Sequence, residues 1–161
     1  MKKKRFTGIL TLSLIIFCIF SNGAFAIDTP KVAEGQVVYV PAYSHIYIGN
    51  KELPYSLTVT LSIRNVNRKH SINITVVDYY ETQGNLVRQY LDKPVTLKPL
   101  ESLRYVIPEK NKEGGSGANF IVEWQAGTLV NTPVVEAIMV GTRSQQGVSF
   151  TSRGRVLSKE Y

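Results

Sequence analysis

Two stretches of the sequence carry residue types that could bind a ligand. In the first, the aromatic stretch, Tyr43, His45 and Tyr47 are spaced two residues apart. In an extended chain this spacing puts all three side chains on one face. Aromatic rings with polar tips can stack on sugars or on the side chains of a protein partner. The alternative is that the tyrosines only seal one end of the folded domain.

The second is the C-terminal stretch, residues 141–155, which is rich in hydroxyl, amide and guanidinium groups. Gln145 and Gln146 fall in a predicted turn. In the strand expected after it, alternation puts four polar side chains on one face, namely Ser149, Thr151, Arg153 and Arg155. Two spaced guanidinium groups can hold a carboxylate or a phosphate bidentately. The alternative is a solvated edge strand whose charges prevent aggregation.

A metal site finds no support in the sequence. The histidines are His45 and His70, and neither has a cysteine or a paired carboxylate at ligand spacing. Arg68 and Lys69 precede His70, and their charges would repel a cation. We therefore predict no metal and no cofactor.

The sequence gives little support for a catalytic site of any kind. No G-x-S-x-G elbow presents a serine nucleophile. The acidic pairs Asp78/Glu81 and Glu123/Glu136 could serve acid–base chemistry, but single acids on outward strand faces usually only contribute to a soluble surface. We expect that the protein is not an enzyme. A small hydrolase or transferase that uses Asp78 or a strand-end serine is the alternative.

The first 26 residues have the pattern of an export signal. Four basic residues at positions 2–5 precede an apolar run over 6–20, and Ala24 and Ala26 supply the small residues of a cleavage site. As a helix, the apolar run would reach only about 22 Å, less than a hydrocarbon core of roughly 30 Å. We predict cleavage after Ala26 and a periplasmic or secreted protein without a membrane span. An uncleaved anchor is the alternative.

Cleavage at this position would change the charge and the chemistry of the chain. The full chain has 161 residues and a net charge of +7, and the signal holds four of the 19 basic residues and none of the 12 acidic ones. The mature chain would have 135 residues (161 − 26) and a net charge of +3 (15 − 12), which gives no case for a nucleic-acid partner. Cys18, the single cysteine, would also be lost, so no disulfide or thiol chemistry is expected.

The elements that must position these residues are predicted to be strands. In 55–65, four aliphatic residues alternate with polar ones and mark one face for burial: Leu57, Val59, Leu61 and Ile63. Gln83-Gly84-Asn85 predicts a hairpin turn. Further strands are predicted over 37–43, 71–80, 86–90, 102–107, 118–125, 133–140 and 148–157.

No stretch of ten or more residues after the signal has a helical period with cap signals. Seven or eight short strands need a second layer to bury their apolar faces. We therefore predict an all-β protein, an antiparallel β-sandwich of immunoglobulin-like architecture. It would occupy residues 37–161 as a single domain, after a polar leader over 27–36. A partly closed barrel is the alternative.

Six blocks of sequence follow one another between Val38 and Arg155: VYVPAYSHIY, VTLSIRN, VDYYETQGNL, LDKPVTLKPLES, GGSGANFIVEW and GTRSQQGVSFTSRGR. In the same order, these blocks resemble those of an uncharacterised family of small exported bacterial proteins, domain of unknown function 3124. The resemblance implies a bacterial source and an envelope or secreted location. It brings no catalytic residues with it. Both candidate stretches lie within the blocks.

Together these observations predict a binding or interaction module that recognises an envelope component, whether a glycan, an anionic ligand or a protein partner. The candidate ligand-binding residues are Tyr43, His45, Tyr47, Gln145, Gln146, Ser149, Arg153 and Arg155. Besides the enzyme alternative, a structural or accessory envelope protein without a small ligand remains open. The two stretches form one site only if they lie side by side in the folded chain.

Overall fold

Alternation of apolar and polar residues produces twelve strand segments in the computed structural model, which describes residues 31–143 and 146–157. A single short 3-10 helix, η1 (Gly115–Gly117), accompanies them in this part of the chain. The strands are β1 (Val32–Pro41), β2 (His45–Ile48), β3 (Leu53–Ser56), β4 (Thr58–Arg64), β5 (Ile72–Tyr80), β6 (Leu86–Gln89), β7 (Val95–Leu97), β8 (Ser102–Ile107), β9 (Asn119–Asn131), β10 (Val134–Arg143), β11 (Gln146–Arg153) and β12 (Arg155–Leu157).

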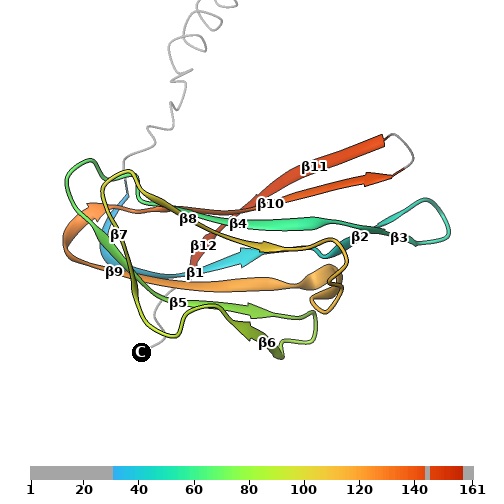
Figure 1. Cartoon of the computed structure of the whole chain (residues 1–161), viewed down its shortest axis with the longest axis horizontal. Helices are drawn as coiled ribbons and strands as arrows, with labels where there is room; N and C mark the ends of the chain where they lie inside the picture. The colour runs from blue at the N-terminus through green and yellow to red at the C-terminus, as the bar shows by residue number, and fades with distance from the viewer. Residues whose placement is uncertain (1–30, 144–145, 158–161) are drawn as a thin grey trace, which may run out of the picture. The chain divides into compact units, whose positions relative to one another are not determined.

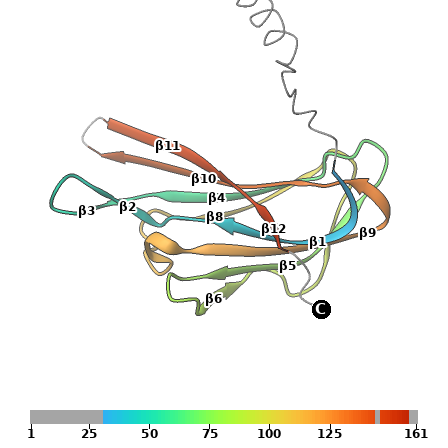
Figure 2. The same cartoon turned by 180° about the vertical axis from the view of Figure 1, so that it is seen from behind.

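Ten of the twelve strands (6 + 4) form two antiparallel sheets that lie in separate layers (Figures 1 and 2). The six-stranded sheet has the order β12-β1-β9-β5-β6, and β7 also pairs with β5. The four-stranded sheet has the order β11-β10-β4-β8, and β2 and β3 form a separate hairpin. The prediction of an all-β antiparallel sandwich is confirmed, and the two-layer arrangement is consistent with an immunoglobulin-like architecture.

The core lies between the inner faces of these sheets. All four aliphatic residues of the alternating stretch are fully buried, as predicted: Leu57, Val59, Leu61 and Ile63. Phe120, Val122 and Trp124 of β9 are buried as well. The indole N–H of Trp124 has no hydrogen-bond partner among the described residues. Each buried aliphatic or aromatic side chain contributes about 1.5–3 kcal/mol to the stability of the fold by leaving water. The alternating pattern of these strands therefore drives the two layers together.

The stretch 55–65 does not form one continuous strand. It divides at Leu57, whose backbone N–H donates a hydrogen bond to the Ser44 carbonyl oxygen at 2.9 Å. Before this point β3 pairs with β2, and after it β4 pairs with β10 and β8. The burial pattern was therefore correct, whereas the strand boundary was not.

The N-terminal part of β1 begins within the segment predicted to be a polar leader. Residues 32–36 pair with β9, with an irregular register between Ala33 and Gly35. A Cβ atom on Gly35 would lie 2.9 Å from the Trp124 carbonyl oxygen. Glycine therefore allows the two backbones to approach at this irregularity, and its presence hid the strand from the sequence pattern.

At its C-terminal end the chain crosses from one layer to the other at Gly154. β11 pairs with β10 in the four-stranded sheet, whereas β12 pairs with β1 in the six-stranded sheet. The Gly154 N–H donates to the Val135 carbonyl oxygen at 2.8 Å, and the Ser152 hydroxyl donates to the Pro41 carbonyl oxygen. The crossing ties the two layers together along this side of the sandwich.

Two buried asparagines hold the connection between β4 and β5. The Asn65 side-chain amide donates to three carbonyl oxygens, those of His70 at 2.9 Å, Leu97 at 3.2 Å and Lys98 at 3.0 Å. Its Oδ1 accepts from the backbone N–H of Asn67 at 2.9 Å. Since Asn65 is 2% exposed, water cannot replace these bonds.

The turn between β5 and β6 is organised by the carboxylate of Glu81. It accepts the backbone N–H groups of Gln83 at 2.8 Å and Asn85 at 3.0 Å, and the Asn85 amide at 2.6 Å. Gly84 has a φ of 89°, as the predicted hairpin requires. The hydrogen bond from Gln83, together with those from Asn85, lowers the pKa of Glu81 below its ordinary value.

Glu81→Gln is expected to flatten the acid limb of the pH–stability curve. A carboxyl group whose folded-state pKa is depressed stabilises the fold above its unfolded-state pKa of about 4.3, and this contribution disappears as the pH falls through the folded-state value. Urea denaturation between neutral and acid pH measures the difference, with Glu52→Gln in the β2–β3 turn as control. An unchanged acid slope in Glu81→Gln would contradict the role assigned to this carboxylate.

Candidate functional site

The outer face of the four-stranded sheet carries charged residues that strand pairing brings into one row. Arg153 of β11 pairs with Glu136 of β10, Glu136 pairs with Ser62 of β4, and Ser62 pairs with Arg104 of β8. Arg64 lies two residues after Ser62 on β4 and therefore on the same face of the strand. We call these five residues the arginine face.

Alternation explains why these side chains point outward. On β4, Leu61 and Ile63 are buried in the core, so Ser62 and Arg64 lie on the opposite side of the strand. Directly paired residues in an antiparallel sheet share a face. Arg104, Glu136 and Arg153 therefore lie on the same outer surface as Ser62.

The arginine face has more positive than negative charge. The Arg64 Nε donates to the Ser62 hydroxyl at 3.0 Å, and its Nη2 lies 3.6 Å from the Glu136 carboxylate. Arg104 and Arg153 are exposed and form no ion pair with any residue that the structure describes. Three arginines and one glutamate leave a local charge of +2 (3 − 1), with two guanidinium groups free to bind a ligand.

The two free guanidinium groups are well separated. Arg153 and Arg104 lie on the first and last strands of the four-stranded sheet, three strand spacings apart. At about 4.8 Å for each spacing, their backbones are about 14 Å apart. Because side chains on strands stand roughly perpendicular to the sheet, the two guanidinium groups are held about as far apart as their backbones, and the arrangement suits a ligand with several anionic groups.

The C-terminal stretch contributes only part of its predicted residues to the outer face of the four-stranded sheet. Ser149, Thr151 and Arg153 are exposed on β11 and pair with outward residues of β10. The expectation that Arg155 shares their face is wrong. Because the chain changes sheets at Gly154, Arg155 pairs with Tyr39 in the six-stranded sheet. Gln146 is the first residue of β11, and Gln145 lies outside the described residues.

The aromatic stretch does not act as a single row. Tyr43 lies in the connection between β1 and β2, half-buried, with its ring centroid 5.8 Å from that of Phe150 on β11. His45 and Tyr47 lie on β2 with ring centroids 5.2 Å apart, and the His45 Nε2 is 3.3 Å from the Tyr47 hydroxyl. Tyr47 is 56% exposed.

The two candidate stretches do lie side by side. The Tyr43–Phe150 contact joins them, and Figures 1 and 2 show the β2–β3 hairpin next to the β10–β11 hairpin. β3 also contacts β10. The contact is made through half-buried aromatic rings, and the free arginines lie further along the outer face of the sheet.

Sequence reasoning did not identify Arg64 or Arg104 as site residues, and it considered Glu136 only as a possible catalytic partner of Glu123. Their outward positions could have been read from alternation, because each is flanked by core-facing residues. Their neighbourhood depends on which strands pair. A single sequence does not show that β10 lies between β4 and β11.

Residues 35–157, which include the whole arginine face, match the family model described as "Protein of unknown function (DUF3124)". The chain belongs to this family. The resemblance inferred from the sequence blocks is thereby confirmed. A comparison with curated proteins finds no match. Among solved structures, the chain is similar to one titled "Crystal Structure of Thermotoga maritima 1070", with 12% identity, coverage of 74% of this chain and 92% of that chain, and a TM-score of 0.46.

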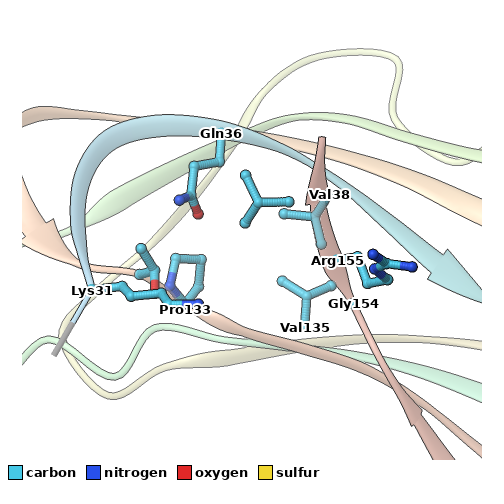
Figure 3. Close-up of a pocket in the computed structure, with 9 residues that line it drawn as sticks. Lys31, Gln36, Val38, Pro133, Val135, Gly154 and Arg155 are labelled. Carbon is cyan, nitrogen blue, oxygen red and sulfur yellow. The ribbon is translucent and has the colours of Figure 1, made fainter. Parts of the chain in front are cut away.

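This DUF3124 chain also has a groove of about 420 Å³ between the edges of its two sheets (Figure 3). Val38 of β1 and Val135 of β10 face each other across it, with Lys31 toward one end and Arg155 toward the other. The remaining lining residues are Gln36, Thr132, Pro133, Gly154 and Val156. The groove has apolar walls and a polar rim, and Arg155 contributes to this rim rather than to the arginine face.

The acidic pairs considered for catalysis do not converge. Glu123 pairs with Val37 and Val76 on the outside of the six-stranded sheet, whereas Glu136 lies on the outside of the four-stranded sheet. The carboxylate of Glu81 accepts hydrogen bonds from the backbone N–H groups of Gln83 and Asn85 in its own turn. Within the described ranges, no three His, Cys, Asp or Glu side chains group as metal ligands, and no helix has the length and apolarity to cross a membrane.

Proposed function

We propose that this protein is an exported, non-catalytic binding module that recognises an elongated polyanion through its arginine face. The observation that carries the proposal is the presence of three arginines around a single glutamate on a solvent-facing sheet. Two of these arginines have no ion-pair partner among the described residues. Guanidinium groups bind phosphate, sulfate and carboxylate with charge-assisted hydrogen bonds.

The surroundings of the arginines favour a chain-like ligand over a compact one. Thr60, Thr151 and Ser149 present hydroxyl groups beside the row of charges, and each can donate to or accept from a sugar or an anion. With both side chains upright on the sheet, the separation of about 14 Å between the outer arginine positions favours a ligand that spans several strands. A polymer with repeated anionic groups has this property.

The predicted export signal would direct the protein to a compartment where anionic polymers occur. Basic residues 2–5, the apolar run and Ala26 together have the pattern of a cleaved export signal. An exported protein would meet anionic groups on the polymers of the cell envelope. The matched family adds no named activity to this proposal.

The experiment compares binding of dextran sulfate and neutral dextran by the protein purified after expression of the full-length chain. Arg153→Gln should weaken binding of dextran sulfate about tenfold, because a lost charge-assisted hydrogen bond costs about 1.5 kcal/mol. Arg155→Gln removes the same charge two residues away, on the other sheet, and should change the affinity less than about twofold. Arg104→Gln should resemble Arg153→Gln.

Equal losses in Arg153→Gln and Arg155→Gln would show that net charge alone controls binding and would overturn the proposal. So would equal binding of dextran sulfate and neutral dextran. Circular dichroism of each variant would establish that the fold is retained.

A further inference from the structure

The four-stranded sheet ends in an unusually accessible edge strand. β11 pairs with β10 in unbroken register from Gln146 opposite Arg143 to Arg153 opposite Glu136. No strand among the described residues pairs with its other edge. Its outward backbone N–H and C=O groups are therefore available to another strand.

This edge lacks the features that normally prevent strand addition. The segment 147–152, GVSFTS, has no charged residue and no proline, and its pairing with β10 has no bulge. The other sheet edges in the described part of the chain are better protected. β8 carries Arg104 near its middle, and β12 and β6 have only three and four residues.

The crossing to the six-stranded sheet limits the free part of β11. The Ser152 hydroxyl donates to the Pro41 carbonyl oxygen, so the strand turns toward β1 from this residue on. The free segment is therefore 147–151. Ser149 is its central residue and faces outward.

We propose that β11 is a self-association edge, at which a second copy of this chain pairs antiparallel with a twofold axis at Ser149. In this register Ser149 faces Ser149 of the second copy, and Gly147 faces its Thr151. Val148 faces Phe150 of the second copy, and the symmetry repeats this pair. Aromatic and β-branched residues form favourable cross-strand pairs, and a twofold interface is self-complementary in this way.

The charge distribution along β11 favours a second copy of this chain as the strand that pairs with its free edge. The paired segment 147–151 is uncharged, and Arg143 and Arg153 lie outside it, so no like charges meet directly. The two four-stranded sheets would become one sheet of eight strands (4 + 4). Both arginine faces would then lie on the same side of that sheet.

Cross-linking tests the register. Ser149→Cys should form a covalent dimer under mild oxidation, because the two Cβ atoms meet at the twofold axis. Thr151→Cys is the matched control on the same face of the same strand. Its two copies would be about 13 Å apart along the strands, too far for a disulfide. The unsubstituted protein controls for Cys18.

Sedimentation of the purified protein tests the association itself. The unsubstituted protein should sediment at twice the monomer mass, and Ser149→Lys and Ser149→Glu should each weaken dimerisation about tenfold or more, since like charges meet at the axis. Mixing the two variants should restore dimers, which excludes misfolding as the cause of the loss. A monomeric unsubstituted protein would overturn the proposal, as would a dimer that Ser149→Lys leaves unchanged or cross-linking of Thr151→Cys equal to that of Ser149→Cys.

Discussion

Asn65→Asp is expected to destabilise the domain by about 3 kcal/mol or more, the largest single effect among the substitutions considered for this fold. The change keeps the shape of the side chain but removes both N–H donors. Three carbonyl oxygens, from His70, Leu97 and Lys98, then lose their partner. A carboxylate would also place negative charge against these oxygens in a site that is 2% exposed.

Urea denaturation followed by circular dichroism measures this effect. Asn50→Asp, in the exposed turn between β2 and β3, makes the same chemical change where water can solvate the new group, and should alter the free energy of unfolding by no more than about 0.5 kcal/mol. If Asn65→Asp and Asn50→Asp had equal effects, the Asn65 hydrogen bonds would not hold the β4–β5 connection as described.

Gly141→Ala is expected to cost about 2–3 kcal/mol, because β10 passes very close to β3 and to Leu57 at this position. A Cβ atom on Gly141 would lie 2.6 Å from the Ser56 carbonyl oxygen, 2.7 Å from the Tyr55 ring and 2.8 Å from the Leu57 side chain. The carbonyl oxygen belongs to the backbone, and Tyr55 and Leu57 are buried, so none of these groups can move aside cheaply.

Gly147→Ala provides the matched control within the same hairpin. A Cβ atom there would meet no atom within 4 Å. This substitution should leave stability unchanged or raise it by up to about 1 kcal/mol, because alanine restricts the unfolded chain. Thermal unfolding of both variants tests the contrast. A Gly141→Ala protein as stable as Gly147→Ala would show that β3 is not held against β10.

The sequence pattern predicted the layers of this fold better than its connections. Alternation identified Leu61 and Ile63 as core residues, because a strand with one buried face must show it locally. The division at Leu57 and the crossing at Gly154 were not predicted. At Leu57 the alternation continues without a break while the backbone changes its pairing partner. At Gly154 the two-residue spacing of the polar side chains runs on from Arg153 to Arg155 although the chain changes sheets.

The same difference between pattern and pairing explains which residues on the outer face of the four-stranded sheet could be predicted. Ser149 and Arg153 were predicted as candidates from their spacing on one strand, and both lie on the outer surface. Arg104 was not predicted, because its proximity to that surface depends on β4 pairing with both β8 and β10. The periodicity of a strand shows which of its two faces is buried. Only the pairing of strands decides which side chains are neighbours on the outer face of the sheet.

The burial of Trp124 gives the molecule an intrinsic optical probe. It is the single tryptophan of the chain, 2% exposed on β9 between the two layers. Its indole emission should be blue-shifted in the folded protein and move to longer wavelength when the layers separate and water reaches the ring. Fluorescence of the unlabelled protein therefore reports the opening of the sandwich from one defined position at its centre.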